Sequence, residues 1–266
     1  MVLPLPTRRE VAWAALATAL TAAYSSAFTP WRWLSEQLSP PALEMLPPAL
    51  ALLLFAIVII HAAPRLRVSG GTTIAWLVTA ATLALAGLLF ADSAFPAKRV
   101  HVFQYALLAL VVRRGLANRL DGVLLVAMSA LVAALLGVHD ELIQGLRPER
   151  YFGLTDILVN TVSAFAGGCL GAALSGPGNS NNPPSPRAWL AVGLALAGLA
   201  VLLSGLTYAP AATLPVWAWL PALLCLASWP LLVPAGRRWP GALPVWLACG
   251  ALVEPAIANL ADLPFA

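Results

Sequence analysis

The chain has 266 residues, of which 61% are hydrophobic and only 10% are charged. Soluble globular domains carry about 25% charged residues, so this composition excludes an ordinary water-soluble domain and favours a protein whose solvent is lipid. The net charge of +4 would suit a nucleic-acid partner, but no basic stripe with interleaved aromatic residues is present. We therefore expect no nucleic acid and interpret the basic residues as membrane topology signals.

Long apolar runs alternate with short charged groups along the chain. A helix of about 20 apolar residues crosses the hydrocarbon layer, and its backbone must be helical because lipid satisfies no hydrogen bonds. Nine runs approach this length: 11–28, 46–63, 72–91, 96–113, 121–139, 156–174, 188–206, 215–233 and 242–259. The sequence therefore predicts an all-α, polytopic transmembrane helical bundle of about nine helices.

The basic residues predict the orientation of this bundle. With the N-terminus inside, ten of the fifteen Lys and Arg residues fall on the cytoplasmic side: Arg8, Arg9, Arg65, Arg67, Arg113, Arg114, Arg119, Arg187, Arg237 and Arg238. The other five fall outside: Arg32, Lys98, Arg99, Arg147 and Arg150. This bias predicts an N-terminus in and, with nine spans, a C-terminus out. The apolar runs that follow the first one favour a retained first helix over a cleaved signal peptide.

Changes in composition divide the chain into four parts. Residues 1–71 hold the first two predicted helices, and residues 72–175 hold a core of four transmembrane helices. The stretch 176–187 contains the sequence GPGNSNNPPSP, which is typical of a flexible linker and is cytoplasmic in the predicted topology. Residues 188–266 form a C-terminal hydrophobic module of about three helices.

Three consecutive predicted helices each carry a polar face, because residues three or four apart share one side of a helix. The faces comprise Lys98, His101 and Tyr105 in the fourth; Gly137, Asp140, Glu141 and Gln144 in the fifth; and Asp156, Asn160, Gly167 and Gly171 in the sixth. The predicted topology places the polar groups at the outer membrane surface, with Arg147 and Arg150 in the connecting loop. We therefore expect them to converge there.

Small residues on the sixth predicted helix favour a close helix crossing. Ser163, Gly167 and Gly171 follow a small-xxx-small pattern, which lets a neighbouring helix approach closely. Asp156 and Asn160 continue the same stripe outward. They are therefore expected to point into the bundle rather than towards lipid.

Four short motifs lie in this part of the chain: Lys98-x2-His101-x3-Tyr105, Gly137-x3-Glu141-x2-Gln144, Pro148-x-Arg150 and Asp156-x3-Asn160. Their order resembles the VanZ-like membrane protein family, whose motifs have the form DKxxHxxxY, GxxxExxQ, PxR and DxxxNxxG. The resemblance covers approximately residues 72–174, and Ala97 and Ser163 stand where the family has Asp and Gly. It implies a multi-pass protein of the bacterial cytoplasmic membrane and cell envelope, associated with antibiotic resistance, namely low-level resistance to teicoplanin.

The candidate functional cluster comprises Lys98, His101, Tyr105, Glu141, Gln144, Arg150, Asp156 and Asn160. Any one of these residues is more simply explained by hydrogen bonds that specify helix packing. Their gathering on one side of the membrane favours a site for an anionic envelope lipid or a lipid-linked cell-wall precursor. Lys98, Arg99, Arg147 and Arg150 would engage the phosphate oxygens. Such binding would modulate susceptibility to teicoplanin.

Two other functions stay open. A membrane-embedded enzyme acting on a lipid-linked phosphate or glycosyl bond would use His101 as general base or Glu141 as acid or base. A small-molecule transporter would use the intramembrane charges along its translocation path. A divalent ion held by Asp140, Glu141, Asp156 and His101 is a variant of the enzyme, but no HExxH or DDxxD spacing supports it. The sequence therefore predicts neither a metal nor another cofactor.

Overall fold

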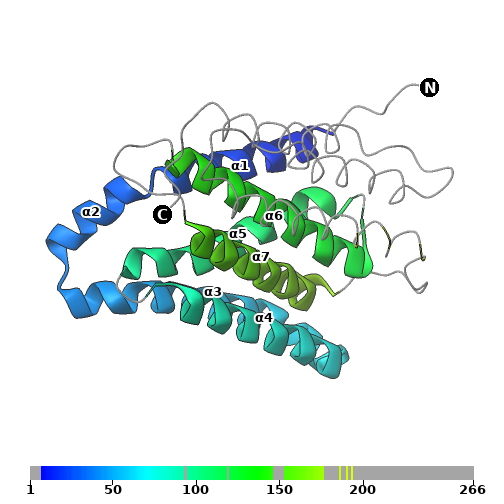
Figure 1. Cartoon of the computed structure of the whole chain (residues 1–266). Helices are drawn as coiled ribbons and strands as arrows, with labels where there is room; N and C mark the ends of the chain where they lie inside the picture. The colour runs from blue at the N-terminus through cyan, green and yellow to red at the C-terminus, as the bar shows by residue number, and fades with distance from the viewer. Residues whose placement is uncertain are drawn as a thin grey trace, which may run out of the picture.

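The computed structural model describes residues 7–92, 95–118, 120–145 and 153–176, and the isolated positions 186, 190 and 193. Seven helices and no strand occupy these ranges: α1 Arg8–Ser25, α2 Phe28–Gln37, α3 Pro40–Val68, α4 Gly70–Phe90, α5 Pro96–Leu116, α6 Gly122–Gly145 and α7 Leu154–Ser175 (Figure 1). The predicted all-α class is confirmed for this part of the chain.

The number of membrane spans differs from the prediction. Four helices are long and apolar enough to cross a membrane, namely α3, α4, the Gly122–Glu141 part of α6, and α7. The helix α1 and residues Pro30–Gln37 form a pair bent by 52° that would make a fifth span. Six spans were predicted before residue 175, so the described residues do not support the count of nine. The last three predicted spans lie almost wholly outside the described residues, as does the linker before them.

The helix α5 has 21 residues but is not among the four apolar candidate spans, and its position in the bundle explains why. It carries two charged residues near each end, Lys98 and Arg99 at the start and Arg113 and Arg114 in the last turn. Eleven of its 21 residues are buried, and it packs against α1, α3, α4, α6 and α7. Because its neighbours are helices rather than lipid, α5 needs no continuous apolar run.

An apolar outer face is formed mainly by α3 and α4. Large exposed aliphatic side chains on these two helices include Leu52, Leu53, Ile57, Ile60, Ile74, Val78, Leu85 and Leu89. An apolar surface of this extent is unfavourable in water and is the surface that lipid requires. The structure therefore supports a membrane protein.

Local signals account for where the first helices begin. The helix α1 starts with a capping box, in which Thr7 Oγ1 accepts from Glu10 N at 3.2 Å and Glu10 Oε2 accepts from Thr7 N at 2.8 Å. The helix α3 starts at Pro40, six residues before the predicted span, which began at residue 46. Proline is favourable in the first turn of a helix because the N–H that it lacks would have no partner within the helix.

A close crossing joins α7 to α5. A Cβ atom added at Gly167 would overlap the carbonyl oxygen of Ala106 and lie 2.7 Å from its Cα. One turn further, a Cβ at Gly171 would overlap the side chain of Arg113. The predicted close helix approach is therefore confirmed at Gly167, whereas Gly171 leaves room for an arginine side chain. Ser163 instead faces α4, where a Cβ at Gly87 would lie 3.1 Å from Ser163 Oγ.

Basic side chains meet at the end of α7. The buried Arg113 donates through Nη2 to Ser175 Oγ at 3.1 Å and to the Gly176 carbonyl at 3.0 Å. Arg65, near the end of α3, also approaches Gly176. These contacts satisfy a carbonyl group at the helix terminus and place positive charge where the dipole of α7 favours it.

Candidate functional site

At the opposite end of the bundle, α5 and α7 begin where α6 ends (Figure 1). The polar residues lie in the first three turns of α5, the first two turns of α7 and the last turns of α6, so antiparallel packing brings them to the same end of the bundle. We call this set the polar cluster: Lys98, His101, Tyr105, Asp140, Glu141, Gln144, Asp156 and Asn160. All of its members except Lys98 are buried.

The outermost contact of the polar cluster is an ion pair between α5 and α7. Lys98 Nζ lies 3.1 Å from Asp156 Oδ2, and the two side chains are 34% and 9% exposed. Asp156 lies in the first turn of α7, where the helix dipole stabilises a carboxylate. The ion pair therefore marks where the cluster reaches the surface of the bundle.

One turn deeper, Asn160 links all three helices. Its Oδ1 lies 2.8 Å from His101 Nδ1, and its Nδ2 donates to the Gly137 carbonyl at 3.4 Å. Because the amide nitrogen already donates, the amide oxygen is the acceptor, so the His101 ring carries its proton on Nδ1. When the ring carries a single proton, Nε2 is its unprotonated nitrogen.

The absence of a side chain at Gly137 makes this arrangement possible. A Cβ atom there would lie 2.8 Å from Asn160 Cβ and 3.0 Å from Tyr105 Cε1, closer than packed carbon atoms come. Only glycine therefore lets α6 approach α5 and α7 at this level.

Below this layer, Tyr105 binds the most buried acid. Its hydroxyl donates to Asp140 Oδ2 at 2.6 Å, and both residues are fully buried. The Tyr105 ring stacks on His101, with a centroid distance of 5.9 Å, and meets Tyr24 of α1 edge-on. The other carboxylate oxygen, Asp140 Oδ1, has no hydrogen-bond partner in the part of the chain that the structure describes.

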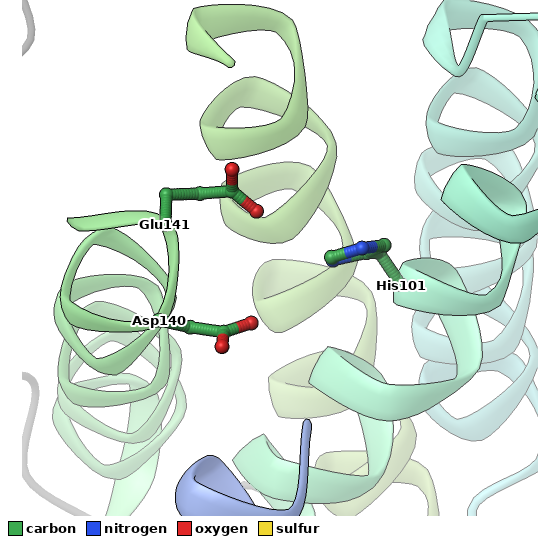
Figure 2. Close-up of side chains that lie close together, drawn as sticks. All are labelled: His101, Asp140 and Glu141. Carbon is green, nitrogen blue, oxygen red and sulfur yellow. The ribbon is translucent and has the colours of Figure 1, made fainter. Parts of the chain in front are cut away.

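The carboxylates of Asp140 and Glu141 project from α6 towards the imidazole of His101 on α5 (Figure 2). One ligand atom from each of these three residues lies within 4.8 Å of the others. Gln144 is buried one turn further along α6. This part of the polar cluster therefore combines an imidazole with two carboxylates.

The structure describes seven of the eight residues predicted for the site. It brings Lys98 to Asp156 and His101 to Asn160, and it places Tyr105, Glu141 and Gln144 in the same buried region. The eighth, Arg150, lies outside the described residues, as does Arg147.

Asp140 is the residue that the predicted set omitted, although it lies on the predicted polar face. Its position three residues after Gly137 places it on the same side of the helix and could have identified it. The motif Gly137-x3-Glu141-x2-Gln144, however, includes the neighbouring Glu141 and not Asp140. Its contact with Tyr105 depends on how α5 and α6 pack.

Comparison with known proteins adds no assignment: no family model, no curated protein and no solved structure matches this chain.

Proposed function

We propose that this chain is a VanZ-like, multi-pass protein of the bacterial cytoplasmic membrane whose polar cluster binds an anionic lipid headgroup. The ligand would be a membrane lipid or a lipid-linked precursor of the cell envelope. The main support for this proposal is the ion pair at the surface end of the polar cluster, where Lys98 is one-third exposed and Asp156 is buried. A lysine ammonium has three donors, and Asp156 orients it without using all of them.

Further groups in the first turn of α5 favour an anion there. Arg99 Nε is buried and has no hydrogen-bond partner among the described residues. The N-cap residue of α5, Phe95, makes no side-chain capping hydrogen bond. Because helix N-termini and arginine side chains both bind phosphate oxygens, this turn suits a phosphate group.

Apolar side chains beside this turn suit the rest of a lipid. Leu89 and Phe90 at the end of α4 and Phe95 before α5 are exposed. A charged headgroup site with apolar neighbours fits a lipid better than a water-soluble anion.

Replacing Lys98 and Arg99 together by Gln is expected to reduce the fraction of protein that co-purifies with anionic lipid by roughly tenfold or more. Each hydrogen bond to a charged group contributes about 1.5–3 kcal/mol. Native mass spectrometry of the protein, purified in mild detergent, measures bound phospholipid or polyprenyl phosphate.

In a teicoplanin-sensitive bacterium, the wild-type chain should lower susceptibility to teicoplanin and the double variant should not.

The matched control is Arg67→Gln with Arg114→Gln, which removes the same charge from exposed positions near the ends of α3 and α5. This control should keep its lipid. Equal lipid retention by the two double variants would contradict the proposed site.

We place the polar cluster on the outer side of the membrane. The support is the positive-inside rule, because Arg65 and Arg113 meet at the other end of the bundle.

Cysteine labelling tests this orientation after Cys169, Cys225 and Cys249 are replaced by Ala. Thr155→Cys, exposed at the start of α7, should react with an impermeant maleimide in intact cells. Ser69→Cys, between α3 and α4, should react only after permeabilisation. The reverse pattern would invert the topology. Gly153 is unsuitable for this probe, since a Cβ there would lie 2.5 Å from Asp156 Oδ2.

A membrane-embedded enzyme acting on a lipid-linked phosphate or glycosyl bond is the second candidate. The observation that favours it is the approach of His101 to Asp140 and Glu141 within 4.8 Å, which brings a possible general base and two acids together.

A further inference from the structure

Asp140 is a fully buried carboxyl group with few polar partners among the described residues. It accepts one hydrogen bond, from Tyr105, and forms no ion pair with any described residue. Its Oδ1 has no hydrogen-bond partner in the described ranges. A buried charge is costly unless it is paired or coordinates a metal ion, so this position favours a cation.

His101 is oriented in the way that metal-binding histidines are. A histidine ligand usually donates its second ring N–H to a fixed acceptor, which sets the tautomer and the direction of the ring. Here Nδ1 donates to Asn160 Oδ1 at 2.8 Å, and Asn160 is held in turn by the Gly137 carbonyl. This hydrogen bond therefore fixes the direction of the imidazole ring, which lies opposite the two carboxylates (Figure 2).

We infer that His101, Asp140 and Glu141 bind one divalent transition-metal ion, with Asn160 and Tyr105 as positioning residues. Their candidate ligand atoms lie within 4.8 Å of one another. In a tetrahedral site with bonds of about 2.1 Å, neighbouring ligand atoms lie about 3.4 Å apart, so side-chain rotations that bring these atoms about 1 Å closer would close the site. Asp140 Oδ1 and His101 Nε2 supply two ligands, and a Glu141 oxygen supplies the third.

The ligand types favour Zn²⁺ or Mn²⁺. Imidazole nitrogen suits Zn²⁺ and other transition metals, carboxylate oxygen suits Mn²⁺, and Mg²⁺ and Ca²⁺ prefer all-oxygen sites. Three protein ligands leave a position open, as in catalytic zinc sites. A phosphate oxygen of the lipid could occupy this open coordination position, and that step rests on the proposed lipid-binding function. Binding of the metal ion itself can be tested without lipid.

The test uses the full chain, purified in detergent through a tag that contains no histidine. After equilibrium dialysis against Zn²⁺ or Mn²⁺, plasma mass spectrometry should find one ion per wild-type chain. Asp140→Asn keeps an acceptor for Tyr105 but removes the charge, and His101→Gln removes the imidazole. Each should weaken ion binding by about tenfold or more. The matched controls, Glu44→Gln and His61→Gln at exposed positions of α3, should bind as wild type does.

Wild-type-like ion binding by Asp140→Asn or His101→Gln would overturn the inference. A second measurement needs no variant: an ion that binds only the folded chain raises its unfolding temperature. Zn²⁺ should therefore raise the unfolding temperature of the wild-type protein more than Mg²⁺ does. Equal shifts, or no shift, would also overturn the inference. Lipid binding is measured separately with the Lys98 and Arg99 double variant, so failures of the two sites are distinguishable.

Discussion

Gly167→Leu is expected to prevent the bundle from assembling. Any Cβ at this position overlaps the backbone of Ala106 in α5, and a backbone carbonyl inside a helix cannot rotate away as a side chain can. Inserting bulk into a packed core costs about 1–3 kcal/mol, and separation of α5 from α7 would also break the contacts of Asn160 and Asp156. Membrane abundance, measured by immunoblot, and the monodisperse fraction in mild detergent should both fall strongly.

The matched control for this prediction is Gly71→Leu in α4. It makes the same change within a helix, but nothing lies within 4 Å of an added Cβ there. Its abundance should stay close to that of the wild type. If the Gly167 and Gly71 variants accumulated equally, the close crossing of α5 and α7 would be wrong.

Asn160→Leu is expected to destabilise the polar cluster while keeping a similar side-chain size. Asn160 is fully buried and binds both His101 and the Gly137 carbonyl. Leucine would leave the His101 Nδ1–H without this acceptor, and a buried unsatisfied donor costs about 1–3 kcal/mol. A lower unfolding temperature in detergent, measured by circular dichroism, would report this loss.

Asn118→Leu provides the comparison, because Asn118 is exposed in the turn after α5. Surface substitutions of this kind usually change stability by at most about 0.5 kcal/mol. Similar unfolding temperatures for the Asn160 and Asn118 variants would mean that the hydrogen bonds around Asn160 contribute little to folding.

The sequence alone determined the membrane character, the helical class and the side of each helix that is polar. These properties are local. A low share of charged residues requires an apolar solvent, and helical phase places Lys98, His101 and Tyr105 on one face whatever packs against it. The small residues at 167 and 171 indicated a close crossing for the same reason, since glycine spacing along one helix defines a flat surface.

Only the tertiary structure decided which side chains meet and which helices face lipid. His101 and Asn160 are 59 positions apart in the sequence, and Tyr105 and Asp140 are 35 apart. Such pairs depend on the rotation and depth of one helix relative to another, which helical phase does not specify. The central place of α5 follows from its contacts with five other helices. Residues 96–113 were counted as a span from the sequence, and only the packing shows why a helix with charged ends lies in the middle of the bundle.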